Sequence, residues 1–242
     1  MTENLVFLKK NSSLGDFSNC FVLVNKESGW TSFDVVAKLR SIFKTKKIGH
    51  AGTLDPLATG LLICAVGKYT KLIPFVQNLP KEYRATFKLG ASTITDDSEG
   101  DEVNIQSTGH LTKQLIINTV SNFIGHISQV PPQYSAIHIN GKRSYALARQ
   151  GKFVTIPARN VIVNSISAHN ISIDKLDLTI NCEKGTYIRS IARDIGNQLN
   201  VGGYMKSLMR TSIGSYKATD SFSINELIEF IKQNNNNMVE LF

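Results

Sequence analysis

The residues from Gly49 to Gly60 place one carboxylate among three glycines, directly before an apolar segment. Glycine allows backbone angles that other residues avoid and lets a ligand come close to the main chain. Asp55 is the only acid in this stretch, so it is the candidate catalytic carboxylate of an active-site loop. Asp followed by Pro is also typical of a helix start. Both interpretations of Asp55-Pro56 are open from the residues alone, and they are compatible.

Other kinds of site have little support in the sequence. Three cysteines and five histidines occur without the spacing of a metal site or of a disulfide framework. The sequence contains no phosphate-binding loop, no dinucleotide fingerprint and no serine nucleophile elbow. We therefore expect no metal and no cofactor, and any catalysis has to come from side chains.

Composition and charge restrict the class of protein. The 242 residues are 42% hydrophobic, enough for one large domain with a substantial core. The net charge of +8 favours a polyanionic partner, with nucleic acid ahead of an anionic membrane surface. The longest apolar run, residues 61–66, is too short to span a bilayer, and no basic and apolar signal segment begins the chain. We expect a soluble cytoplasmic protein.

The elements that must position Asp55 follow from residue patterns. Residues 21–24 predict a buried strand, and a helix from about Ser32, with Val36, Leu39 and Phe43 on its apolar face, ends in the basic residues 44–47. That cluster is either a solvated helix end or a phosphate contact. Strict alternation predicts a strand over 82–89 with Tyr83 on its apolar face, where a core tyrosine is the default interpretation.

Further elements follow later in the chain. The acidic segment 93–108 predicts a mobile surface loop, and residues 111–123 predict a helix. Asn140-Gly141 predicts a hairpin turn, residues 176–182 a strand that leads into a helix ending near Leu199, and residues 224–233 a last helix capped by Ser223. Strands and helices are mixed without regular alternation, so we expect an α+β fold on a mixed, mostly antiparallel sheet.

Four separated motifs strongly resemble the bacterial tRNA pseudouridine synthase B family, and the resemblance covers about residues 21–230. In order they are Ile48 to Gly60, Lys81-Glu82-Tyr83-Arg84, Gln129 to Ala136, and Lys184 to Ser190. The first motif alone is close to diagnostic. The resemblance implies the pseudouridine synthase fold, with a central sheet flanked by helices and loops.

The implied activity is isomerisation of the T-loop uridine of tRNA to pseudouridine, without a cofactor. The glycosidic bond is broken and the uracil is rejoined through its carbon 5, which requires the nucleotide to be flipped into a pocket. The implied partner is the T arm of tRNA, and we expect a monomer. A tRNA-folding chaperone that needs no chemistry is the alternative function, and an isomerase acting on ribosomal or guide-directed RNA is a third.

The resemblance also implies roles for single residues. Asp55 would attack the ribose C1′ or remove a ribose proton, and Arg189 is expected to pair with it. Tyr83 would stack on the uracil, Tyr187 would pack and hydrogen-bond in the pocket, and Leu208 would form an apolar wall. His50 would help to hold the opened tRNA loop. The expected substrate-binding residues are therefore His50, Tyr83, Tyr187, Arg189 and Leu208.

Charge and position suggest RNA phosphate contacts, which position a substrate without reading its sequence. The candidates are Lys26, Lys71, Lys142, Arg143 and Arg149. We expect residues 1–242 to form a single catalytic domain with peripheral segments at 1–20 and 234–242. On this prediction the small C-terminal RNA-binding domain that many family members carry is absent.

Overall fold

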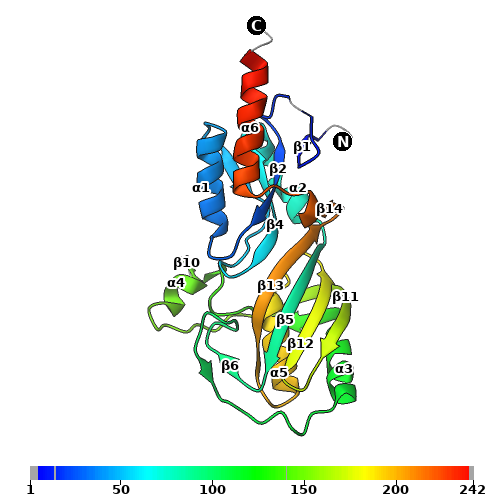
Figure 1. Ribbon diagram of the computed structural model, residues 1–242. Coiled ribbons are helices and arrows are strands. Elements are labelled where there is room, and N and C mark those ends of the chain that lie inside the picture. The colour runs from blue at the N-terminus through cyan, green and yellow to red at the C-terminus, as the bar shows by residue number, and fades with distance from the viewer. Residues whose placement is uncertain (1–4, 14, 140, 240–242) are drawn as a thin grey trace. The chain divides into compact units, whose positions relative to one another are not determined.

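The computed structural model describes residues 5–13, 15–139 and 141–239, in two compact units (Figure 1). Unit 1 comprises residues 1–82 and 209–242, and unit 2 comprises residues 83–208. The boundary falls within two strands, β5 (Lys81–Leu89) and β13 (Gly203–Ile213), so each unit contains one part of each.

Unit 1 is built on the sheet order β1-β2-β4-β13, with β3 paired to β4 and β14 to β13. Its strands are β1 (Phe7–Leu8), β2 (Phe21–Lys26), β3 (Ile48–His50), β4 (Thr59–Val66) and β14 (Tyr216–Lys217). Its helices are α1 (Ser32–Ile42), α2 (Ile73–Gln77) and α6 (Ile224–Val239), with short 3-10 helices η1 (Gly67–Leu72) and η2 (Ala218–Asp220). The expected strand at 21–24 and helix from Ser32 are confirmed.

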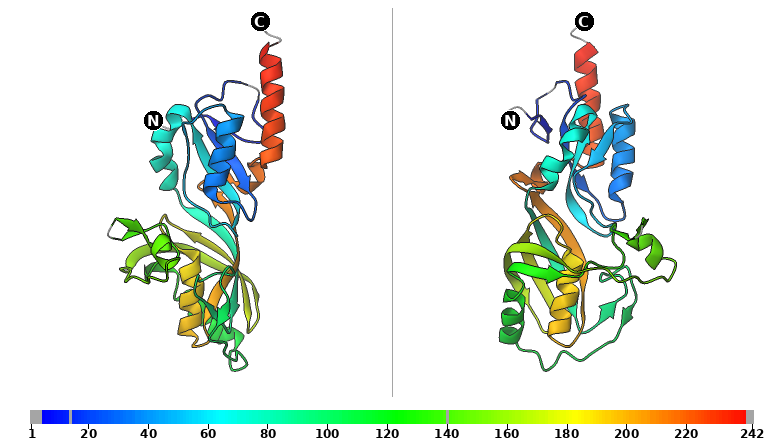
Figure 2. Two further views of the ribbon diagram at one scale, coloured as in Figure 1. Left: turned by 90° about the vertical axis from the view of Figure 1, so that its left-hand side faces the viewer. Right: turned by 180° about the vertical axis from the view of Figure 1, so that it is seen from behind.

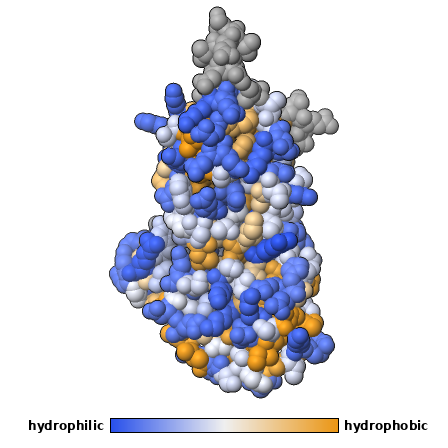
Figure 3. Space-filling view, in the orientation of Figure 1, coloured by the Kyte–Doolittle hydropathy of each residue, from blue (hydrophilic) through white to orange (hydrophobic). Residues whose placement is uncertain are grey.

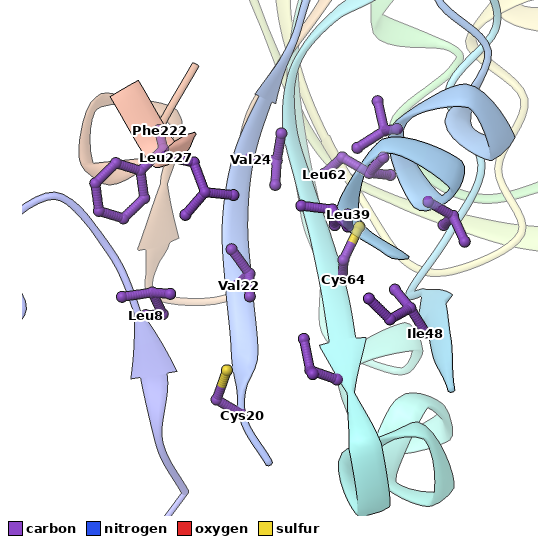
Figure 4. Close-up of a cluster of buried hydrophobic side chains, with 13 residues drawn as sticks. Leu8, Cys20, Val22, Val24, Leu39, Ile48, Leu62, Cys64, Phe222 and Leu227 are labelled. Carbon is purple, nitrogen blue, oxygen red and sulfur yellow. The ribbon is translucent and has the colours of Figure 1, made fainter. Parts of the chain in front are cut away.

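Unit 1 has two buried apolar clusters, one of which lies between its sheet and the helices α1 and α6. Alternate residues of β2 and β4 meet Leu39 of α1 and Leu227 of α6 in one apolar cluster (Figure 4). Val36 and Leu39 are buried as expected, and Phe43, which caps the end of α1, packs partly against the cluster. Leu8 of β1 is also fully buried there. The opposite, outward side of α1 and α6 is largely hydrophilic (Figure 3).

Helix capping explains where α1 and α6 begin. Thr31 and Asp34 form a reciprocal capping box at the start of α1, and Ser223 and Glu226 do the same at α6. The hydrogen bond from Lys10, and after it the one from the Ser223 amide, lowers the pKa of the Glu226 carboxyl to about 2. The predicted cap at Ser223 is confirmed.

Unit 2 continues with the order β13-β5-β12-β11-β8. Its further strands are β6 (Ser92–Thr93), β7 (Glu102–Val103), β8 (Gly125–Gln129), β9 (His138–Ile139), β10 (Lys142–Arg143), β11 (Arg159–Ile171) and β12 (Lys175–Cys182). Its helices are α3 (Lys113–Ser121), α4 (Ser144–Ala148) and α5 (Ile188–Gln198). The two longer helices, α3 and α5, cover one face of the β8-β11-β12 part of the sheet (Figure 2).

The sequence patterns of unit 2 are mostly confirmed. In β5 the side chains of Tyr83, Ala85, Phe87 and Leu89 are buried and the alternate ones face outward. Strands β9 and β10 pair as the predicted hairpin, although Asn140 of its turn lies outside the described residues. Most strand pairs are antiparallel, and β1-β2 and β4-β13 are parallel. The expected α+β class with a mixed, mostly antiparallel sheet is therefore confirmed.

The acidic segment 93–108 differs from its prediction as a surface loop. Asp97 is 1% exposed and Asp96 is mostly buried, and each carboxylate contacts an arginine of α5. Residues 101–107 are all exposed, as are Ile94, Ser98 and Glu99. The prediction was wrong for 93–97 because acidic composition indicates solvent only where no buried cation offers an ion pair.

Candidate active site

The loop that carries Asp55 connects β3 to β4 in unit 1. The amide of Ala58 donates to the carbonyl of Asp55 at 3.1 Å, which closes a turn, and β4 begins at Thr59. Asp at the first position and Pro at the second are favoured in such a turn. The interpretation of Asp55-Pro56 as a helix start was therefore wrong, because the residues that follow pair with β2 as a strand.

Neutral hydrogen bonds hold this loop to the segment around the start of α1. The hydroxyl of Ser32 accepts from the amide of Leu54 at 2.9 Å and donates to the carbonyl of Leu54 at 3.1 Å. The amide of Gly29 donates to the carbonyl of Pro56 at 2.9 Å. The half-buried Asp55 thus lies between two anchored residues, Leu54 and Pro56.

Lys26, the last residue of β2, supports the far side of the same turn. Its side chain is 1% exposed, and its ammonium donates to the carbonyls of Trp30 at 2.6 Å, Glu27 at 2.9 Å and Pro56 at 3.1 Å. This burial argues against the phosphate contact that we expected for Lys26. Sequence alone could not show it, because a lysine at a strand end is ordinarily exposed.

Arg210 of β13 supports the near side of the loop, and sequence reasoning missed it. Its guanidinium donates to the carbonyls of Leu61 at 2.7 Å, Gly52 at 3.2 Å and Thr53 at 3.5 Å. Gly60 lies opposite Arg210 in the β4-β13 pair with φ +97°, and a Cβ there would collide with the Arg210 backbone. The one available signal was its place two residues after Leu208 in a segment that we had already singled out.

His50, at the end of β3, lies partly buried at the entry to this loop. Burial lowers the pKa of its imidazole, the charge of Arg210 lowers it further, and a hydrogen bond with the Gly52 backbone opposes both effects. Its Nδ1 is buried and has no hydrogen-bond partner among the described residues. His50 therefore carries a buried ring nitrogen whose hydrogen-bonding capacity is unused among the described residues.

In unit 2 the structure brings together two of the motifs, residues 129–136 and 184–190. The side-chain amide of Gln129 donates to the carbonyl of Tyr187 at 3.0 Å and accepts from its amide at 2.8 Å. The hydroxyl of Ser190 donates to the carbonyl of Val130 at 2.9 Å. These bonds fix the start of α5 against the end of β8.

Arg189, 5% exposed, is held in the same place by groups from two segments, residues 93–97 and 129–136. Its guanidinium donates to the carbonyls of Tyr134 at 3.0 Å and Thr95 at 3.1 Å, and lies 3.5 Å from a carboxylate oxygen of Asp97. Arg189 is thus a buried arginine and not a helix-surface one. Whether it also pairs with Asp55 stays a prediction.

One turn along α5, Arg193 contacts Asp96 at 2.9 Å and the carbonyl of Val130 at 2.7 Å. Burial raises the pKa of the Asp96 carboxyl, while the charge of Arg193 opposes that rise. Two arginines of one helix thus hold two adjacent carboxylates. This is why the segment 93–97 is fixed to α5.

The remaining predicted substrate-binding residues also lie in unit 2. Tyr187 is half-buried, with the guanidinium of Arg159 4.6 Å from its ring centre. Tyr83 of β5 is 9% exposed and Leu208 of β13 is 8% exposed. Their burial fits both a core position and a wall of a binding site.

The other candidate phosphate contacts are exposed. Lys142 and Arg143 form β10, Arg149 follows α4 with its guanidinium 5.6 Å from the ring centre of Tyr145, and Lys71 lies in η1.

No group of three metal-ligating side chains occurs in the described ranges. Within the same ranges, none of the helices has both the length and the apolar character needed to cross a membrane.

Solved structures with a similar fold include the archaeal box H/ACA sRNP Nop10-Cbf5 complex and a Cbf5-Nop10-Gar1 complex. The first has a TM-score of 0.67 at 24% identity and covers 91% of this chain, which spans 56% of that one. The second has a TM-score of 0.69 at 26% identity and covers 97% of this chain and 66% of the other. These likenesses confirm the expected pseudouridine synthase fold.

Sequence comparison gives closer relatives. A protein of Paenarthrobacter aurescens (strain TC1) named tRNA pseudouridine synthase B is 42% identical over 214 residues, 86% of this chain and 69% of the relative. One of the same name from Gloeothece citriformis (strain PCC 7424) is 47% identical over 210 residues, 86% of this chain and 68% of the relative. The prediction of a single catalytic domain without a further RNA-binding domain is not tested by these matches.

Two family profiles match consecutive parts of the chain. Residues 40–188 match the profile described as TruB family pseudouridylate synthase (N terminal domain). Residues 189–241 match the one described as tRNA pseudouridylate synthase B C-terminal domain. With its fold, its motifs and these relatives, the chain belongs to the TruB family of pseudouridylate synthases.

Proposed function

We propose that this protein isomerises the T-loop uridine of tRNA to pseudouridine, with Asp55 as the catalytic carboxylate. The observation that carries the proposal is the construction of the Asp55 loop. Two buried cations, Lys26 and Arg210, and the hydroxyl of Ser32 hold the backbone on both sides of one half-buried acid. Relatives named tRNA pseudouridine synthase B support tRNA as the substrate.

The reaction needs a carboxylate in a fixed position, because the ribose C1′ and the uracil must both reach it after the nucleotide leaves its stack. Asp55 then either adds to C1′ as a nucleophile or removes a ribose proton as a base. Either role gains from an anchored backbone, since misplacement of a reacting group by about 1 Å can reduce a rate about 10²-fold.

The substrate-binding roles belong to the same proposal. His50, whose buried Nδ1 has no hydrogen-bond partner among the described residues, is proposed to help hold the opened tRNA loop. Tyr83 is assigned to stacking on the uracil, which contributes about 1–3 kcal/mol for a stacked base. Tyr187, Arg189 and Leu208 are proposed as further substrate-binding residues.

Four exposed cations are proposed as tRNA phosphate contacts, namely Lys71, Lys142, Arg143 and Arg149. Phosphate contacts fix the register of an RNA and leave its recognition to loop shape and splayed bases. We further propose that the protein acts as a monomer in the cytoplasm.

The test is conversion of an unmodified tRNA transcript by the purified protein, followed by mapping of pseudouridine at single-nucleotide resolution. Product at the T-loop uridine, and its absence with Asp55→Asn, is the expected result. Product elsewhere in the tRNA, or only in ribosomal RNA fragments, would refute the assigned substrate. Wild-type turnover by Asp55→Asn would refute the assigned catalytic residue.

A further inference from the structure

Arg210 is an unusual residue for its place in the fold. Its side chain is 1% exposed and is one of the largest fully buried side chains in the described part of the protein. The guanidinium contacts three backbone carbonyls, those of Gly52, Thr53 and Leu61. Two of them belong to the loop before Asp55, and the third belongs to the strand after it.

The charge of this side chain is costly where it lies. A buried cation normally needs an ion pair, and the structure shows no ion pair for Arg210 among the described residues. An apolar side chain of similar volume would fill the same space without that cost. The guanidinium is therefore best explained by the carbonyls that it fixes.

We propose that Arg210 is a positioning residue for Asp55, acting through the backbone of the loop and not by touching substrate. This inference rests on the proposed catalytic role of Asp55. The planar guanidinium has donors that point in several fixed directions, so one side chain joins the start of the loop to β4. Lys26, which binds Pro56, completes the support on the other side of Asp55.

Only arginine fits this arrangement. Lysine retains the charge but presents a compact ammonium, which cannot reproduce the fork of Nε and two Nη groups over three carbonyls. The acceptors are backbone carbonyls, which remain when the accepting residues are substituted. This particular support of the loop is therefore tested by changing Arg210 itself.

The experiment measures single-turnover conversion of a tRNA transcript separately from tRNA affinity, in Arg210→Ala and Arg210→Lys. We expect the conversion rate of Arg210→Ala to fall about 10²-fold while the tRNA Kd changes little. Added guanidinium ion should restore part of the rate in Arg210→Ala and none in Asp55→Asn. Val36→Ala, on the buried face of α1, is the matched control for lost stability and should keep the wild-type rate below its own melting temperature.

Hydrogen exchange gives a readout that needs no activity. Amides of residues 51–58 should exchange faster in both Arg210 variants, while amides of α1 should not; Arg210→Lys provides this measurement if Arg210→Ala does not fold. Unchanged loop exchange, a wild-type rate, or equal losses of rate and affinity would overturn the inference. A fully active Asp55→Asn would instead refute the proposed catalytic role of Asp55, while the exchange result still tests the support by Arg210.

Discussion

Two irregular segments, the Asp55 loop at 51–58 in unit 1 and the acidic segment at 93–97 in unit 2, are both fixed by buried cations, but through different acceptors. In the first, Lys26 and Arg210 bind backbone carbonyls at the two sides of the acid. In the second, Arg189 and Arg193 bind the carboxylates of Asp97 and Asp96 themselves.

The two segments differ in the atoms that the cations bind. The carboxylates of Asp96 and Asp97 pair with arginines of α5, and these ion pairs hold the segment to the helix. Lys26 and Arg210 bind backbone carbonyls on the two sides of Asp55, so the support that these two cations give the loop goes through the main chain. An acid whose backbone is anchored separately is suited to chemistry.

The largest expected effect comes from the acid of the first segment. Asp55→Asn should lower turnover on a tRNA transcript by about 10³-fold or more, because general acid–base chemistry alone contributes about 10²–10⁴-fold. The change is isosteric, so the melting temperature and tRNA affinity should stay near those of the wild type. Asp101→Asn, an exposed acid, is the control and should leave turnover unchanged.

The second segment should respond through stability. Asp97→Ala removes the carboxylate that lies 3.5 Å from Arg189 and also accepts from Thr95 at 2.6 Å. Breaking a buried ion pair costs about 3–5 kcal/mol, which thermal and urea unfolding would detect. Asp101→Ala should change stability by no more than about 0.5 kcal/mol. Equal effects of the two substitutions would show that the ion pair does not hold the segment.

Acid should affect the two segments in opposite directions, with a smaller effect than either substitution. The pKa of His50 is lowered in the folded protein, so below 6.5 the unfolded chain binds more protons and stability falls as the pH falls. The pKa of Asp96 is raised, so stability gained at low pH is lost as the pH rises through that pKa. Melting temperatures of His50→Asn and Asp96→Asn, measured across pH, would separate the two contributions. Each variant should lose the part of the pH dependence of stability that its own residue causes.

The smallest expected effect concerns exposed cations outside both segments. Lys142→Gln and Arg143→Gln should each weaken tRNA binding modestly and reduce the slope of log K against log salt by about one. The control is Lys232→Gln, on the outer face of α6 beside Glu229, which should change neither. An unchanged slope for both β10 variants would remove β10 from the tRNA contacts.

Much of this protein follows from local residue patterns. Alternation predicted β5 with Tyr83 inward, the Ser223 cap predicted the start of α6, and Asn140-Gly141 predicted the β9-β10 pairing. Each depends on neighbours in sequence, where side-chain direction and turn geometry are strongly restricted. The family motifs in turn identified the loop around Asp55.

The errors share one physical cause, which is that burial of a charge depends on partners distant in sequence. Asp97 was expected in an exposed loop because its segment is polar and acidic, yet its partner Arg189 lies 92 positions later. Lys26 was expected at the surface, and its acceptor Pro56 lies 30 positions away. Asp55-Pro56 was compatible with a helix start until pairing with β2 showed that a strand follows.

By itself, the sequence determined the class of fold, the family and the acid on which the chemistry is proposed to depend, because these follow from periodicity and from one uninterrupted motif. Only the tertiary structure decided how that acid is held. Arg210 is 155 positions from Asp55 in the chain, and its role depends on the pairing of β13 with β4, which places its guanidinium under the loop. Hydrogen bonds of such long sequence separation form only when the sheet has assembled, so no local pattern records them.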